Sequence, residues 1–140
     1  MKLHEFSKAK ELFRSATELS IDAEIITDEI ARNYIKKVFE KYKPGKTSGH
    51  FSISSSARRI PTDEYESSFS RNLKEEKAYV FFEQNQIDKN TVFIISDARE
   101  LSKVIENSFG MEYFISNQET SYLIAVNWYS IEYTGEVNLN

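Results

Sequence analysis

Residues 77–137 decide the fold, and they read KAYVFFEQNQIDKNTVFIISDARELSKVIENSFGMEYFISNQETSYLIAVNWYSIEYTGEV. Runs rich in Val, Ile, Phe and Tyr predict strands over 77–83, 91–95, 111–116, 122–128 and 131–137. After the second run, Asp97 is placed as an N-cap with Glu100 three residues on, and Gly110 ends an apolar helical stripe. The predicted order is strand, strand, helix, strand, strand, strand, which makes a mostly antiparallel sheet of about five strands with one helix-covered face.

The spacing of apolar residues predicts how the last two strands lie in the sheet. In 122–128 both alternating sets are largely apolar, which is typical of a central strand buried on both faces. In 131–137 the residues Glu132, Thr134 and Glu136 share one face, so we expect that face to meet solvent and the other to meet the core. The last strand is therefore predicted to be half-buried.

The first 76 residues predict mainly helices. Ser7 is placed to cap one helix, and a second runs from Thr27 to the Pro44-Gly45 break with apolar residues at helical spacing. A Ser-rich loop follows over 43–61, where Phe51 and Ile53 alternate with serines as in a short edge strand, and a third helix is predicted after Pro61. With the sheet-forming part, the chain is predicted to be a single α+β domain over residues 1–140.

Composition excludes several classes of protein. The 140 residues are the size of one ordinary domain, and the absence of cysteine excludes disulfides, thiolate metal sites and cysteine nucleophiles. Residues 1–6 lack the apolar run that a signal peptide needs, and no apolar run approaches the length of a membrane span. We expect a cytoplasmic protein without membrane contact.

Charge divides unevenly along the chain. Residues 1–76 hold 14 Lys and Arg against 13 Asp and Glu, whereas residues 77–140 hold 4 against 9, so the net charges are +1 and −5. An acidic sheet disfavours nucleic acid as its ligand and favours a basic protein surface. A solvated acidic face that only keeps the protein soluble is the alternative.

No catalytic or metal-binding spacing is present. The two histidines, His4 and His50, have neither a second imidazole nor a carboxylate at ligand spacing, so both are predicted to be surface residues. The Gly-Lys-Thr at 45–47 lacks the first glycine of a phosphate-binding loop and follows a helix, and the adjacent Arg58-Arg59 pair is typical of a solvated loop. Trp128 and Tyr129 suit a stacking surface for a base or sugar, but their pattern favours buried core aromatics. We expect a non-enzyme without cofactor or metal.

The residues Glu100–Glu106, Gly110–Ile115, Leu123–Tyr129 and Gly135 carry a resemblance to a known class of protein. With them, the segment Leu101–Val137 resembles the closing part of small bacterial immunity or antitoxin proteins of polymorphic toxin systems, including contact-dependent growth inhibition. Where that pattern has histidines after the asparagine, this chain has Trp128 and Tyr129, so no catalytic residue carries over.

The resemblance implies a stoichiometric inhibitor that binds a cognate toxin, for example a nuclease domain with a basic cleft. A row of carboxylates would complement such a cleft and speed association. The predicted docking surface consists of Glu112, Glu119, Asn127, Tyr129, Glu132 and Glu136. The alternative is a non-catalytic module that binds a small ligand or nucleic acid with the Ser-rich loop.

Overall fold

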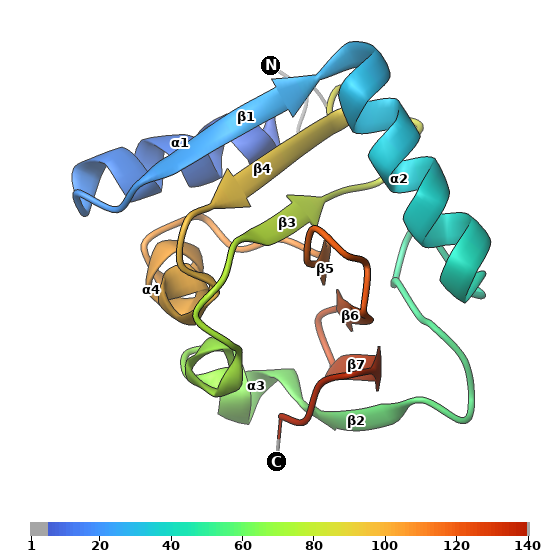
Figure 1. The fold of residues 1–140 in the computed structure, drawn as a ribbon. Helices are drawn as coiled ribbons and strands as arrows, with labels where there is room; N and C mark the ends of the chain where they lie inside the picture. Colours follow the sequence, from blue (N-terminus) through green and yellow to red (C-terminus); the bar gives the residue numbers. More distant parts are fainter. Residues whose placement is uncertain (1–5, 140) are drawn as a thin grey trace.

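The computed structural model describes residues 6–139, in which helices cover both faces of one antiparallel sheet (Figure 1). The helices are α1 (Lys8–Glu18), α2 (Asp28–Tyr42), α3 (Thr62–Tyr65) and α4 (Leu101–Glu106), with 3-10 turns at Phe69–Asn72 and Ala98–Glu100. The strands are β1 (Ala23–Thr27), β2 (Arg58–Pro61), β3 (Ala78–Phe81), β4 (Thr91–Ile95), β5 (Tyr113–Ser116), β6 (Tyr122–Val126) and β7 (Ser130–Gly135). They form a seven-stranded sheet in the order β1-β4-β3-β5-β6-β7-β2.

The predicted α+β class is confirmed, and so are the five strands of the carboxyl-terminal half. The sheet has seven strands instead of five because the amino-terminal half supplies both edges. β1 pairs with β4 and β2 pairs with β7, each antiparallel. A short strand between two helices carries too little pattern to be read from sequence, and pairing with a distant strand supplies what local propensity lacks.

The edge strand predicted at Phe51 and Ile53 is wrong, because β2 begins later, at Arg58. Pro61 ends this strand, in keeping with the edge position where a missing backbone N–H removes no ladder bond. Phe51 and Ile53 are instead buried within a loop that lies on the sheet. These two apolar side chains pack against the sheet, and their backbone does not pair with a strand.

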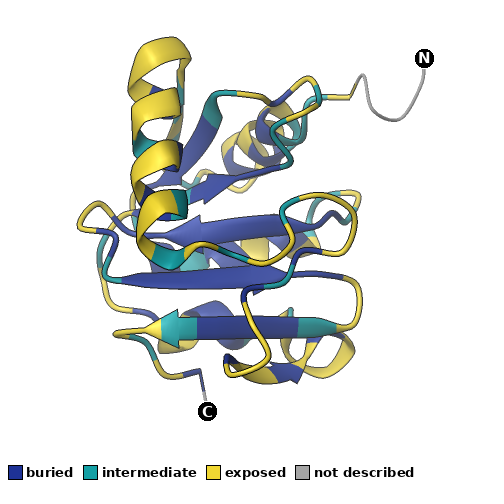
Figure 2. Ribbon diagram, turned by 90° about the vertical axis from the view of Figure 1, so that its right-hand side faces the viewer, coloured by how far each residue is buried: buried dark blue, intermediate teal, exposed yellow. Residues whose placement is uncertain are grey.

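Helices cover both faces of the sheet, so the predicted single covered face is wrong. One core cluster joins α1, α4 and the 3-10 turns to the face that carries Tyr122, Ile124 and Val126, and a second joins α2 and the 43–57 loop to the opposite face. Figure 2 shows the result, with buried strands between helices whose outer surfaces are exposed. The interior position of β6 matches its prediction, since both of its alternating sets are buried.

A carboxylate from a distant loop caps α1. Ser7 is the predicted N-cap, and its Oγ accepts a hydrogen bond from the Lys10 amide. Asp88, only 2% exposed in the β3–β4 loop, accepts from Ser7 Oγ at 2.7 Å and from the Lys8 amide at 2.8 Å. These bonds satisfy amide groups that the first helical turn leaves unpaired and join α1 to the sheet.

The β5–β6 turn fastens α2 to the opposite face. Tyr34 Oη donates to the Asn117 carbonyl at 2.6 Å, and Tyr42 Oη donates to the Thr120 carbonyl at 2.8 Å. The Tyr34 ring also stacks on Tyr79 with centroids 4.6 Å apart. Because both hydroxyls end on one turn, the helix is held in a single register along the sheet.

Glu66 makes stability depend on pH. Burial raises the pKa of this carboxyl, although the hydrogen bond that Tyr113 Oη donates to it at 3.0 Å acts in the opposite direction. Between pH 4.5 and the raised pKa, the folded state therefore binds more protons than the unfolded state. The contribution of Glu66 to the stability of the fold falls as the pH rises through that window. We expect the free energy of unfolding of Glu66→Gln, relative to wild type, to be higher at pH 7 than at pH 4.

Urea denaturation at a series of pH values measures this difference. Glu64→Gln is the matched control, because Glu64 lies in α3, which Glu66 caps at its C-terminus, and is exposed. Its difference from wild type is expected to stay constant with pH. A constant difference for Glu66→Gln as well would show that the buried carboxyl carries no such pH dependence.

Candidate functional site

A strap, residues 49–53, crosses the α2 side of the sheet beyond the end of that helix. The loop comes off the left-handed C-cap Lys43 and turns back on itself through paired hydrogen bonds between Lys46 and Ser52. Burying such a loop leaves its backbone groups without water, so they need partners from the sheet. Side chains of four different strand segments supply them.

Three carboxylates and one amide hold the strap. Glu83 accepts from the Gly49 amide at 3.1 Å, Glu112 from the Phe51 amide at 3.2 Å, and Asn127 donates to the Phe51 carbonyl at 2.8 Å. Glu132 accepts from the Ile53 amide at 2.9 Å and from Ser52 Oγ. The pairings of β3, β5, β6 and β7 place these side chains on the α2 side, because residues two apart share a face.

The predicted exposure of Glu112 and Glu132 is therefore wrong. Glu112 is 9% exposed and Glu132 is 4% exposed, and Asn127 is also buried. Their side chains meet the strap where the sequence pattern suggested solvent. The period-2 pattern of 131–137 correctly separated two faces, but it could not show that a loop covers the polar one.

The remaining predicted docking residues lie at opposite ends of the sheet. Tyr129 follows β6, whereas Glu119 precedes it, and Glu136 pairs with Ser121 at that same far end through a 2.8 Å backbone bond. All three are exposed. The six predicted residues thus include three that are exposed but separated, and they do not form one surface.

A cleft of about 870 Å³ opens at the Tyr129 end of the sheet. Its walls combine the strap, the start of α1, the end of β3 and the connection between α4 and β5. The lining includes Phe6, His50, Glu83, Phe109, Glu112 and Trp128. A concave site that joins apolar rings with a few polar groups is typical of binding sites.

Exposed aromatic side chains form the rim of this cleft. Phe6 and Phe109 meet edge to face with centroids 6.4 Å apart, and Trp128 is 54% exposed, so its predicted core role is wrong. Tyr129, 72% exposed, lies edge to face with His50 at 5.1 Å. Exposed rings gathered on one patch mark interaction sites, because soluble proteins rarely leave such patches bare.

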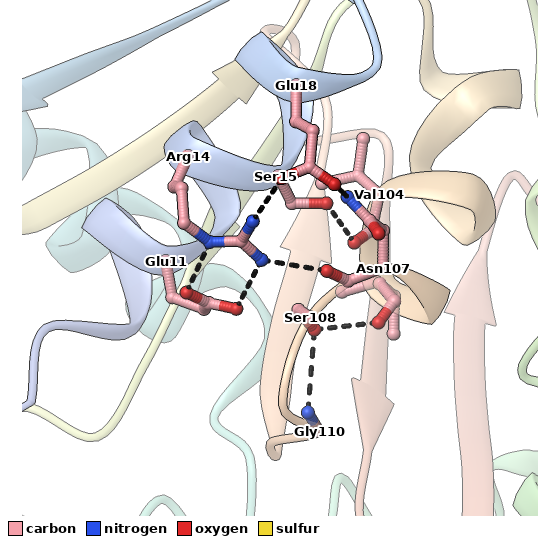
Figure 3. Close-up of polar contacts among 9 residues, drawn as sticks. Glu11, Arg14, Ser15, Glu18, Val104, Asn107, Ser108 and Gly110 are labelled. Carbon is pink, nitrogen blue, oxygen red and sulfur yellow. Dashed lines mark hydrogen bonds and ion pairs between the residues drawn. The ribbon is translucent and has the colours of Figure 1, made fainter.

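A polar network holds the segment that carries Phe109 (Figure 3). Arg14 of α1 donates to Glu11, to Glu18 and, at 2.8 Å, to the Asn107 carbonyl at the end of α4. Ser15 Oγ donates to the Val104 carbonyl at 2.7 Å. The hydrogen bond from Arg14 lowers the pKa of Glu11, which also accepts from the Phe109 backbone. The rim is therefore attached to α1 and does not depend on its own loop alone.

Four titratable groups line the cleft. His50 is exposed, as predicted, and its Nδ1 lies 2.9 Å from Oε2 of Glu112, a carboxylate too distant in the sequence for local spacing to show. Glu83 and Lys8 are half-buried, and within residues 6–139 neither forms an ion pair. With a neutral imidazole, the lining carries one net negative charge from Glu83, Glu112 and Lys8.

Sequence reasoning missed the cleft because its parts are distant in the chain. His4 lies outside the described residues. The sequence feature that could have indicated the cleft is that Phe109 and the Trp128-Tyr129 pair stand beside turns, where rings are hard to bury.

The Arg58-Arg59 pair was predicted to be solvated. Arg59 is 3.7 Å from Glu132, so one member of the pair faces the carboxylate that holds the strap.

Between residues 6 and 139, no three His, Asp or Glu side chains are grouped so as to hold a metal ion. Over the same span, none of the helices has the length and apolar character needed to cross a bilayer. No protein-family model, curated protein or solved structure matches this chain closely enough to show a relationship.

Proposed function

We propose that this chain is an immunity-type protein that neutralises a cognate bacterial toxin by stoichiometric binding, and that the aromatic rim of the cleft contacts the toxin. The observation that carries this proposal is the exposed set of Phe6, Phe109 and Trp128 around one cleft, with the exposed Tyr129 beside it on His50. The resemblance of Leu101–Val137 to immunity proteins supports the class of partner.

The rim has the composition of a protein interface. Trp and Tyr are enriched among residues whose truncation weakens binding most, since their rings bury large areas at little entropic cost. The hydrogen bond that Arg14 donates to the Asn107 carbonyl, two residues before Phe109, reduces the ordering that association requires. The chain's net charge of −4 also speeds encounter with a basic partner.

Trp128→Ala is expected to weaken toxin binding about 30-fold, which corresponds to about 2 kcal/mol for an interface aromatic. Because Trp128 is exposed, the variant should unfold at the wild-type temperature. The toxin domain is to be identified from the reading frames next to this gene. Titration calorimetry against that domain measures the affinity, and rescue of growth on co-expression measures neutralisation.

Glu119→Gln with Glu136→Gln is the matched control, because it removes both far-end carboxylates and leaves the chain with a net negative charge. Both glutamates are exposed, but they lie at the far end of the sheet, so toxin binding should change by less than about threefold. If this control loses binding while Trp128→Ala keeps it, the docking surface is the far acidic end. Full binding by both variants would contradict a role for either end.

A groove beside α2 favours a second candidate, binding of a nucleic acid. It measures about 590 Å³ and is lined by four cationic side chains against one carboxylate, Glu40. These cations are Arg32, Lys36, Lys43 and Lys89. Fluorescence anisotropy with a labelled single-stranded oligonucleotide tests it, because phosphate contacts make affinity fall steeply with salt. Absence of salt-dependent binding would remove this candidate.

A further inference from the structure

We infer that the aromatic cleft receives an arginine side chain, which rests on the proposed function because the toxin would supply that arginine. The chemistry lies in one place: a carboxylate with spare hydrogen-bonding capacity, exposed aromatic rings, and space open to solvent. The group that the partner presents to the cleft is therefore a guanidinium.

Glu83 is the carboxylate best placed to pair with an incoming cation. Glu112 uses both oxygens within the protein, one for the Phe51 amide and one for His50. Glu83 uses Oε1 for the Gly49 amide, and between residues 6 and 139 no hydrogen bond engages its Oε2. A half-buried carboxylate oxygen in a cleft strengthens a charge-assisted bond relative to one at an open surface.

The aromatic rim favours guanidinium over ammonium. Trp128 is half exposed and lies beside Gly110, where an added Cβ would meet its ring at 3.7 Å, so the indole covers the backbone at the cleft wall. A planar guanidinium stacks on such rings and offers several donors in a fixed fork, whereas an ammonium is more strongly hydrated. The volume of about 870 Å³ leaves room for the backbone next to the arginine.

The positive charge of Lys8 repels a bound cation. Removing this charge therefore tells whether the occupant of the cleft is cationic or anionic. Its side chain lines the same cleft, while its amide, not its ammonium, donates to Asp88. Removing this charge therefore leaves the cap of α1 intact. A cationic occupant should bind better without Lys8 and worse without the Glu83 charge, and an anionic occupant should do the reverse.

Fluorescence of Trp128 reports on the cleft directly, since it is the single tryptophan of the chain. The probe is the peptide acetyl-Gly-Arg-Gly-amide, titrated into the full chain at low salt. We expect a saturable change in emission, about tenfold weaker binding by Glu83→Gln, and tighter binding by Lys8→Gln. Glu83→Gln keeps an acceptor for the Gly49 amide, so the strap should stay in place.

A peptide with citrulline in place of arginine keeps the shape and removes the charge, and it should bind at least tenfold more weakly. Equal binding of the two peptides, no saturable change, or reversed effects of Glu83→Gln and Lys8→Gln would each overturn the inference. If the arginine peptide fails to bind while Trp128→Ala still weakens toxin binding, the inference fails and the proposed function stands. If the chain binds the arginine peptide but does not neutralise the toxin, the cleft accepts arginine and the proposed function fails.

Discussion

Replacing Glu132 by alanine is expected to lower the free energy of unfolding by about 3 kcal/mol, because the buried Ile53 amide and the Ser52 hydroxyl lose a charged acceptor. The carboxylate is 4% exposed and accepts from the Ile53 amide at 2.9 Å and from Ser52 Oγ at 3.0 and 3.1 Å. Alanine leaves the Ile53 amide buried without a partner. Urea denaturation measures the loss, and hydrogen exchange at Ile53 should accelerate with it.

Two variants separate the anchor from the charge. Glu132→Gln keeps an acceptor and is expected to lose only part of the stability, while Glu136→Ala removes an exposed carboxylate of the same strand region and should change it by less than about 0.5 kcal/mol. Equal, small losses for all three would mean that the strap does not depend on Glu132. Because His50 of the strap lines the cleft, Glu132→Ala should also weaken toxin binding.

Gly135→Ala is expected to cost about 3 kcal/mol, because strain and a steric clash add. Gly135 ends β7 with φ of +88°, a conformation that residues with a Cβ adopt at a cost. An added Cβ would lie 2.6 Å from the Ser121 carbonyl oxygen and 2.8 Å from Tyr122 Cα, both backbone atoms of the adjacent strand segment. Thermal and urea unfolding measure the change.

Gly49→Ala is the control for backbone strain alone. Gly49 also has a positive φ, of +69°, but the nearest atoms to its added Cβ belong to the flexible Lys46 side chain at 3.5 and 3.7 Å. We expect a cost of about 1 kcal/mol. If Gly49→Ala lowers the free energy of unfolding as much as Gly135→Ala does, the clash with the backbone before β6 contributes nothing, and backbone strain alone accounts for the loss.

The sequence predicted the parts of the fold that repeat a local pattern. β4 and the body of α2 match their predicted ranges, because alternation and helical spacing reflect burial directly. β1 was missed because its five residues are only half-buried at an edge, where the pattern is weak. The sequence did not predict that helices cover both faces. The face on which each helix packs depends on long-range contacts, which the local spacing of apolar residues does not encode.

The site was predicted less well, for a physical reason that Glu112 and Glu132 illustrate. A carboxylate in an alternating strand predicts water on its face, since burying it alone is costly. Here a loop supplies the hydrogen bonds that make burial tolerable. Tyr129 is exposed, so the reading of its ring as part of the core is wrong, and its place in a docking surface stays a prediction. Phe6 and Phe109 are far apart in the sequence and meet only in three dimensions.

The order of strands has a consequence for how the chain reaches this state during synthesis. Both edges of the sheet, β1 and β2, belong to the first half of the chain, and each waits for a partner from the second half. Until β7 has left the ribosome, β2 has no neighbour and β6 presents an open edge. Pairings between residues so far apart slow folding, so the nascent chain passes through a period in which its apolar strands can join those of other chains.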